Sequence, residues 1–404
     1  MLRSVIRPLR ESASVLRPLG SLEEFFWLVD QDTPVHFVVA AEVEGRTTIA
    51  GWREALDLVQ RRHPLLSACI EANAGSAPYF SQTTASPIAM RFVQGNNALE
   101  SWDLDVEREL SLPFNTGRVP LVRAVLLHEP ERAVYMLTAH HSIADGLALT
   151  FVIRDTLQVL SGQPIGLLPP PPSHEAILGL TGDRAGQPGF TNQPHLALPT
   201  TPTTNCRKAN VHPLVRSLCL SPALASKLRE RARREGTTVH GALSSGVALA
   251  CKRISGESSN DSLFAVVRVK PSSPAAFWDI ARRAMADLAE ARTRRGIRAC
   301  CDFLHQTVLS GLDVPAAAGL LQQGLAHDIL LLNLGNLRYE TGFGELRLRA
   351  LWGPAAVNGA EKMQTIGVAT TDGVLRLLHS SCAPIESLLE VTEQILISAC
   401  AHAG

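Results

Sequence analysis

The sequence predicts a mixed protein of the α/β or α+β class that is built from two lobes. Segments with strand-like and helix-like hydrophobic patterns occur in both halves of the 404 residues. Hydrophobic residues make up 46% of the chain and charged residues 19%, which indicates a large apolar core. A stretch rich in proline, glycine and threonine divides the pattern. We therefore expect an N-terminal lobe over 1–167, a linker over 168–208 and a C-terminal lobe over 209–404.

The charge balance of the chain argues against partners that are recruited by a strong overall field. Lysine and arginine number 38, and aspartate and glutamate also number 38, so the formal net charge is zero. We therefore expect no nucleic-acid partner. No run of about 18 apolar residues occurs, so we expect no membrane span.

The cysteines and the N-terminal residues indicate in which cellular compartment the protein is expected. Eight cysteines are spread along the chain without a C-x-x-C pair, which gives a zinc ribbon no support and is typical of a reducing compartment. The first residues carry Arg3, Arg7 and Arg10 before any acid, as a transit peptide would. Pro8 interrupts an amphipathic helix there, so we favour an ordinary leader into the first strand. We expect a cytoplasmic monomer.

In the first half, the hydrophobic period changes between that of a helix and that of a strand. Residues 21–30 have apolar side chains at helical spacing, whereas 34–44 are valine-rich and strand-like. Further strands are expected at 62–72, 77–82, 120–128 and 132–139, and further helices at 47–62 and 146–160.

The second half repeats this mixture. Ser221 and Pro222 are favoured residues for the start of a helix, and Gly236 marks its end. Asp372 and Gly373 are favoured in the turn of a β-hairpin. We expect strands at 214–220, 263–269, 329–334, 346–351, 364–370 and 374–380, and helices at 222–234, 238–253, 275–296 and 384–401.

One segment carries the residues that general base chemistry needs. A predicted strand runs into His140 and His141, and Asp145 and Gly146 open the next helix. A histidine at a strand end, with an unperturbed pKa of about 6.5, can take a proton from a hydroxyl or amine that attacks a carbonyl. Asp145 could accept a hydrogen bond from the ring or pair with an arginine. Gly146 allows close approach of a backbone or a substrate.

The alternatives at this segment are structural. The two histidines could be loop residues and Asp145 only the N-cap of a helix, but the doubled histidine and the Asp-Gly pair favour catalysis. A metal site is not expected, because adjacent side chains on a strand point apart and no H-E-x-x-H motif occurs. A serine hydrolase is disfavoured because the chain has no G-x-S-x-G motif.

Residues 140–146 match the H-H-x-x-x-D-G motif, and the chain resembles the condensation-domain superfamily. That superfamily includes the condensation domains of nonribosomal peptide synthetases, the polyketide-associated acyltransferases and, more distantly, chloramphenicol acetyltransferase. Weaker similarities follow in the same order along the chain: Val15–Leu19 with Glu23–Phe26, Arg62–Leu66, Leu112–Phe114 with Pro120–Ala124, Thr237–Leu243, and Asn333–Gly335.

The resemblance implies two lobes like chloramphenicol acetyltransferase that form a V with a central tunnel between them. It makes His141 the catalytic base and gives His140 a structural role. It also implies that Asp145 is structural, in a buried pair with an arginine. Arg268 in a predicted strand is the expected arginine, with Arg338 as the alternative.

The resemblance also implies the activity. We expect a free-standing acyltransferase that moves an acyl group from acyl-CoA or an acyl carrier protein to a small-molecule alcohol, in lipid, polyketide or other secondary metabolism. No bound cofactor and no metal are expected. Backbone amides near Gly146, together with Asn333 and Gly335, would bind the oxyanion or line the tunnel.

The sequence leaves open which molecule carries the acyl group and which molecule accepts it. Arginine-rich helical faces, such as that of Arg294 and Arg295, could receive an acidic carrier protein or the phosphates of CoA, or could be solvated surface. Two alternative functions also remain. One is an amide-forming condensation enzyme with an amine acceptor, and the other is a degenerate condensation fold that only binds partners.

Overall fold

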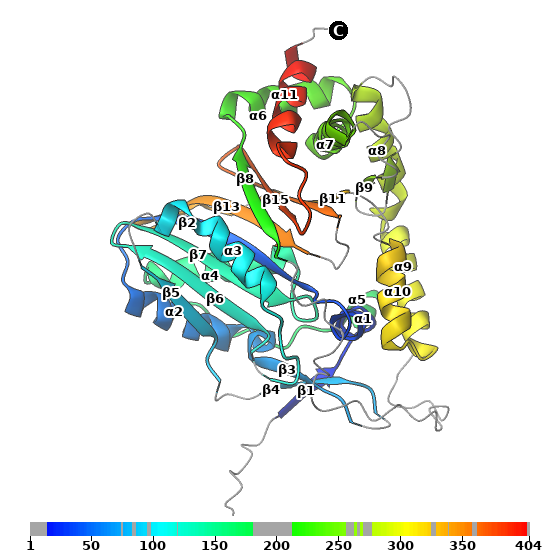
Figure 1. The fold of residues 1–404 in the computed structure, drawn as a ribbon. Coiled ribbons are helices and arrows are strands. Elements are labelled where there is room, and N and C mark those ends of the chain that lie inside the picture. Colours follow the sequence, from blue (N-terminus) through cyan, green and yellow to red (C-terminus); the bar gives the residue numbers. More distant parts are fainter. Residues whose placement is uncertain are drawn as a thin grey trace, which may run out of the picture.

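The computed structural model describes most of the chain. The described residues are 14–73, 76–82, 86–94, 98–118, 120–180, 212–255, 262–264, 267–269, 277–324, 329–337, 339–357 and 362–401. Within these ranges, the strands form two six-stranded sheets and one three-stranded sheet, with helices packed around them (Figure 1). The predicted mixed class, α/β or α+β, is therefore confirmed.

The elements of the first half follow one another in short segments. The strands are β1 (Ser14–Pro18), β2 (His36–Glu44), β3 (Ala68–Glu71), β4 (Tyr79–Gln82), β5 (Ala89–Val93), β6 (Val122–Glu129) and β7 (Arg132–His140). The helices are α1 (Ser21–Asp30), α2 (Ile49–Arg62), α3 (Trp102–Ser111), α4 (Gly146–Leu160) and α5 (His174–Leu178).

The second half has more helix. Its strands are β8 (Leu214–Cys219), β9 (Ser262–Phe264), β10 (Val267–Val269), β11 (Ile329–Asn336), β12 (Gly342–Phe343), β13 (Leu346–Ala356), β14 (Gln364–Thr371) and β15 (Val374–Ser381). Its helices are α6 (Pro222–Arg234), α7 (Val239–Ser255), α8 (Phe277–Ala291), α9 (Arg294–Leu309), α10 (Val314–Gly324) and α11 (Leu388–Ala401).

The first large sheet has the strand order β12-β13-β2-β7-β6-β5. Its central strands β2 and β7 are antiparallel, and their register places His36 opposite His140. Helices α2 and α4 lie against one face of this sheet, and α3 lies against the other face, toward β8 (Figure 1). The strand that ends in the two histidines is therefore in the middle of the sheet, with a neighbour on each side.

Strand β2 is buried on both faces, which explains its nearly continuous apolar sequence. Phe37 and Val39 belong to the core under α2 and α4, whereas Val38 and Ala40 belong to the core on the opposite face. Side chains alternate between the two faces of a strand, so both sets must be apolar.

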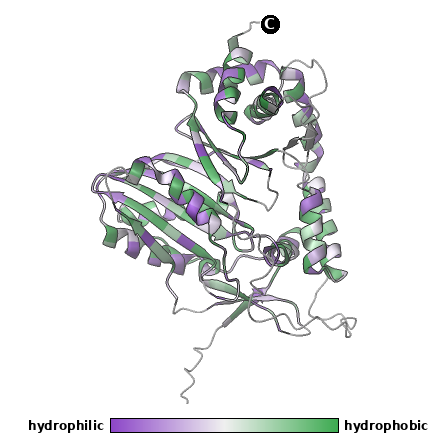
Figure 2. Cartoon of the chain, in the orientation of Figure 1, coloured by the Kyte–Doolittle hydropathy of each residue, from purple (hydrophilic) through white to green (hydrophobic). Residues whose placement is uncertain are grey.

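The second large sheet has the strand order β10-β9-β11-β14-β15-β8. Strands β11 and β14 are parallel, whereas β14 with β15 and β15 with β8 are antiparallel. Helices α6, α7, α8 and α11 cover one face and share a core with it (Figure 1). Figure 2 shows that hydrophobic residues run along the strands of both large sheets, as expected for sheets with covered faces.

Strand β13 joins the two large sheets. It comes from the second half of the chain but pairs antiparallel with β2 of the first sheet, and it also contacts β14 and β15. The two strands come so near at Gly367 on β14 that a Cβ atom there would overlap the carbonyl oxygen of Pro354. Only glycine fits at this crossing. The lobe boundaries, the V and the tunnel stay predictions, and much of the expected linker, residues 181–208, lies outside the described part.

Two predicted elements are divided in the structure. The helix expected at 275–296 is two helices, because the Thr293 hydroxyl accepts a hydrogen bond from the Gly296 amide (2.9 Å) and caps α9. The strand expected at 263–269 is an antiparallel pair, β9 and β10. Both corrections concern breaks that hydrophobic period alone does not mark.

The sequence patterns leave some elements unpredicted, among them α3 and α10. Helix α3 buries Trp102, Val106 and Leu110, whose four-residue spacing is helical but is obscured by the charged residues between them. None of the helices in the described part of the chain combines the length and the apolar character that crossing a membrane requires.

The Arg62–His63 pair at the end of α2 fastens this helix to α4. Arg62 Nε and His63 Nε2 lie 2.7 and 2.9 Å from Oδ2 of the buried Asp155, and Arg154 Nη2 lies 2.6 Å from Oδ1. Burial alone would raise the pKa of Asp155, but the hydrogen bonds from His63, Arg154 and Arg62 outweigh it and lower the pKa to about 2.

We expect Asp155→Ala to lower the free energy of unfolding by about 2–4 kcal/mol, because it leaves two guanidinium groups without their buried partner. Urea unfolding at pH 7 measures this. Asp57→Ala, which removes a more exposed ion pair with Arg53, is the matched control and should cost less than about 1 kcal/mol.

The pH dependence follows from the lowered pKa of Asp155. The carboxylate is stabilised in the folded state, so its contribution is complete above its unfolded pKa of 3.8 and is lost as the pH falls through about 2. The difference between wild type and Asp155→Ala should therefore shrink below about pH 4. An equal cost for the two variants at pH 7 would contradict the special role of this network.

Candidate active site

The two histidines lie where β7 ends and the chain turns into α4. The His141 amide donates to the Val35 carbonyl (3.0 Å), and the Ile143 amide donates to the His140 carbonyl (3.1 Å). The first bond extends the contact with the segment before β2 by one residue. The second closes a turn in which the chain reverses its direction. His140 is therefore inside the sheet, and His141 is just beyond its end.

The imidazole of His141 packs against two aromatic rings. Its centroid is 4.8 Å from that of Phe26 on α1, with an interplanar angle of 21°, and 4.4 Å from that of Phe37 on β2, with an angle of 30°. The residue is partly exposed. Burial among these rings is the main cause that lowers the pKa of His141 to about 3; the charge of His140 adds to the shift, and the Ala144 backbone opposes it. The ring is therefore neutral at physiological pH.

His140 is fully buried, and its two ring nitrogens face different groups. Nδ1 accepts a hydrogen bond from the Ser142 amide (3.0 Å), which places the ring proton on Nε2. Nε2 lies 3.4 Å from Oδ1 of Asp30 at the end of α1, and the Val35 amide also donates to that oxygen (3.2 Å).

The carboxyl of Asp30 stays ionised in this buried position. Burial alone would raise its pKa, but the hydrogen bond and charge of His140, with the Val35 amide, outweigh it and hold the pKa of Asp30 below its usual value. A negative charge next to the Nε2 proton fixes the tautomer of His140, as a carboxylate commonly does for histidine.

Asp145 and Gly146 shape the start of α4. Asp145 is exposed, and its Oδ1 accepts a hydrogen bond from the Ala148 amide (2.7 Å), so this side chain is the N-cap of the helix. A Cβ atom at Gly146 would lie 3.0 Å from Leu334 Cδ2 and 3.2 Å from Pro354 Cγ. The glycine therefore lets α4 begin against residues of β11 and β13.

The predicted oxyanion or tunnel residues lie next to this contact. Leu334, which touches the position of Gly146, stands between Asn333 and Gly335 in β11. The Gly335 amide donates to Oδ1 of Asn333 (2.8 Å), so the asparagine side chain closes a local turn. The structure brings this part of β11 to the start of α4, and the role of both residues stays a prediction.

The predicted arginine partner of Asp145 is not settled by the described residues. Arg268 belongs to β10 and pairs through its backbone with Leu263, but its side chain lies outside the described part. Arg338, the alternative, also lies outside it. The Asp145–Arg268 pair therefore stays a prediction beside the observed N-cap.

Sequence reasoning missed the contribution of α1 to the site. Phe26 stacks on His141, Asp30 faces His140, and the Glu23 carbonyl accepts a hydrogen bond from the Ser142 hydroxyl (2.8 Å). The sequence holds part of this information, because positions 23, 26 and 30 share one face of the helix that it predicts at 21–30.

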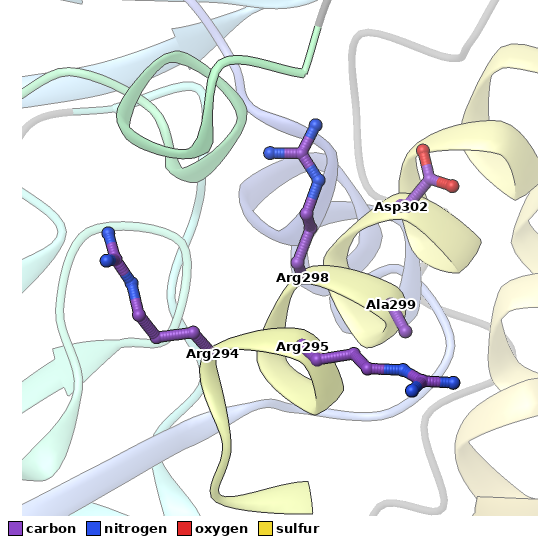
Figure 3. Close-up of a pocket in the computed structure, with 5 residues that line it drawn as sticks. All are labelled: Arg294, Arg295, Arg298, Ala299 and Asp302. Carbon is purple, nitrogen blue, oxygen red and sulfur yellow. The ribbon is translucent and has the colours of Figure 1, made fainter.

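A separate surface hollow of about 390 Å³ lies on α9 and is lined by Arg294, Arg295, Arg298, Ala299 and Asp302. Figure 3 shows that the arginine side chains extend in different directions rather than toward a common point. Arg298 also donates to the Leu178 carbonyl (2.6 Å). The arrangement therefore does not form a convergent anion site.

We expect His141 to make the folded state less stable in acid. Its folded pKa lies below its unfolded value of 6.5, so its stabilising contribution is complete above pH 6.5 and is lost as the pH falls toward about 3. Between pH 7.5 and 5 the loss is about 2 kcal/mol for one such histidine.

Urea unfolding of wild type and His141→Gln at both pH values measures this loss, which should be smaller in the variant. His212→Gln, at an exposed position, is the control and should keep the wild-type pH dependence. The same pH dependence in His141→Gln as in wild type would contradict the buried, neutral state of this ring.

Comparisons with known proteins agree on the architecture. No protein-family profile matches the chain. A hybrid PKS-NRPS synthetase of Penicillium crustosum is 26% identical over 239 residues, which is 53% of this chain and 6% of that protein. A phosphinothricin tripeptide synthetase of Streptomyces viridochromogenes is 30% identical over 174 residues, 38% of this chain and 15% of that protein. The chain thus spans a small part of these curated relatives.

Solved structures match over nearly the whole chain. Polyketide synthase associated protein 5 of Mycobacterium tuberculosis has a TM-score of 0.65 at 16% identity, covering 98% of this chain and 100% of that one. The first condensation domain of the calcium-dependent antibiotic synthetase has a TM-score of 0.69 at 16% identity, covering 97% and 98%. The wax ester synthase/diacylglycerol acyltransferase of Marinobacter aquaeolei has 0.60 at 14%, covering 95% and 98%. The predicted resemblance is thereby confirmed, and the chain has the fold of condensation domains and polyketide-associated proteins.

Proposed function

We propose that this protein is an acyltransferase that moves an acyl group from a phosphopantetheine thioester to an alcohol, with His141 as the general base. The observation that carries the proposal is the imidazole of His141. It belongs to a partly exposed residue just beyond the end of β7, and burial against Phe26 and Phe37 keeps the ring neutral. A neutral imidazole is the form that can accept a proton.

The first step uses this base. The acceptor hydroxyl donates its proton to a ring nitrogen of His141 while its oxygen attacks the thioester carbonyl carbon. The low pKa of about 3 means that nearly every molecule carries the basic form at neutral pH. It also means that a charged imidazolium without a nearby negative charge is unfavourable in this position. The proton must therefore move while negative charge develops on the carbonyl oxygen.

The oxyanion needs fixed donors near the start of α4. Asp145 occupies the Ala148 amide through its side chain and the Leu149 amide through its carbonyl, which leaves the amides of Gly146 and Leu147 in the first turn as the donors we assign. The positive end of the helix dipole favours negative charge at the same place. The carbon–sulfur bond then breaks, and the thiolate takes the proton back from His141.

The comparisons support the proposed donor and acceptor classes. The relatives are named as polyketide and peptide synthetases, and one structural neighbour is named as a wax ester synthase/diacylglycerol acyltransferase. These names support a thioester donor, carried by CoA or by an acyl carrier protein, and an alcohol acceptor. No cofactor takes part in this reaction, because the thioester supplies the activated acyl group.

The test follows thiol release from a panel of acyl-CoA thioesters and, separately, from acylated carrier protein, each with alcohol and amine acceptors. We expect His141→Ala to fold and to lower kcat/KM by about 10²–10⁴-fold, the usual contribution of a general base. His212→Ala changes an exposed histidine and is the matched control, with wild-type turnover expected.

Three outcomes would count against the proposal. A folded His141→Ala variant with near-full activity would remove the base from the mechanism. Transfer to amines only would replace ester formation by amide formation. A wild-type protein that releases no thiol with any donor and acceptor would favour a protein that only binds its partners.

A further inference from the structure

Three consecutive residues at the end of β7, His140 to Ser142, each contact the same helix, α1. The ring of His140 has Nε2 3.4 Å from Asp30 Oδ1, the ring of His141 stacks on Phe26 at 4.8 Å, and the hydroxyl of Ser142 donates to the Glu23 carbonyl at 2.8 Å. All the α1 groups lie within one face, since positions 23, 26 and 30 are separated by three and four residues. More than a hundred residues of chain separate the two segments.

We propose that this face of α1, formed by Glu23, Phe26 and Asp30, positions the imidazole of His141 for proton transfer. The inference rests on the proposed function of His141 and adds positioning residues to it. Phe26 touches the face of the ring, so its contact sets the plane of the imidazole without occupying the ring nitrogens.

The other two contacts hold the backbone on either side of His141. Asp30 fixes the tautomer and position of the His140 ring, whose Nδ1 in turn accepts from the Ser142 amide (3.0 Å). The Ser142 hydroxyl ties the next residue to α1. The loop therefore has one anchor before the base and one after it, both on the same rigid element, which is the condition for a well-defined catalytic geometry.

Helix α1 is held firmly enough to position His141, because buried polar contacts fix its first turn. The Ser21 amide donates to Glu175 Oε1 on α5 (2.8 Å), and the Ser21 hydroxyl forms a hydrogen bond with His305 Nδ1 on α9 (2.8 Å). The Gly20 amide donates to Glu23 Oε2 (2.6 Å), and Arg17 pairs with the same carboxylate. Segments from both halves of the chain thus hold one end of the helix.

If Phe26 only stabilised the fold, replacing its neighbour Phe25 would have the same effect on activity. Phe25 therefore serves as the control. Phe25 is buried in the core, and its ring lies 5.7 Å from that of Phe26. The ring contacts found for His141 in the described residues are with Phe26 and Phe37. Phe25→Leu therefore removes the same atoms from the same helix without removing the stacked ring.

The experiment compares Phe26→Leu with Phe25→Leu, and Ser142→Ala with Ser142→Thr, in the full chain. We expect Phe26→Leu and Ser142→Ala to lower kcat by about 10–100-fold with KM changed less than about twofold, because misplacement of the base affects the transition state. Phe25→Leu should lose at least as much thermal stability and keep kcat. Ser142→Thr keeps the hydroxyl and should restore most of the activity.

A second readout does not depend on turnover. The ring protons of His141 lie over two aromatic faces, so their NMR resonances should be shifted upfield. Phe26→Leu should move them downfield, and Phe25→Leu should leave them in place. If wild type transfers no acyl group from any donor, the proposed function fails, while this measurement still shows whether Phe26 orients the His141 ring. Wild-type kcat in Phe26→Leu, or unchanged His141 resonances, would overturn the inference.

Discussion

The antiparallel pairing of β2 with β7 is the constraint on which the rest of the structure depends. Its register sets His36 opposite His140, and both strands lie in the middle of the first large sheet. A slip by one residue would move Phe37 into the core that holds Val38 and Ala40, where its larger side chain does not fit. The register is therefore strongly specified, and with it the point where His141 leaves the sheet.

The same burial determines the charge state of the site. His36, His140 and His141 are close enough to influence one another, and burial keeps His36 and His141 neutral, with the pKa of His36 lowered to about 4. His36 Nε2 forms a hydrogen bond with the Leu110 carbonyl (3.0 Å) at the end of α3. The three histidines therefore do not repel one another. Within the described residues, Asp30 is the buried negative charge that contacts them, through His140. A base prepared in this way needs no further deprotonation before it reacts.

Local patterns predicted much of the fold and the central residues of the site. The helices expected at 21–30 and 146–160 have those bounds in the structure, and the H-H-x-x-x-D-G motif lies between a strand and a helix as expected. Contacts between distant segments were not predictable in this way. Asp30 meets His140 because two separate elements pack together, and no local spacing records that meeting.

Strand order shows the same limit. The apolar pattern of 346–351 predicts a strand but not its partner, and β13 pairs with β2 of the first sheet. The break at Thr293 and the division into β9 and β10 depend on a capping side chain and a turn, which an average hydrophobic period does not contain. The pairing of Asp145 with Arg268 remains a prediction, while the N-cap formed by Asp145 is observed.

The crossing of β13 has a consequence for how the chain can be divided. In the intact protein this strand covers one edge of β2 along most of its length. A fragment that ended before β8 would leave β2 as an open sheet edge with a run of valine and alanine side chains, and such edges pair readily with other chains. Separate expression of the first half is therefore a route to aggregation, and the second half protects it by contributing a single strand.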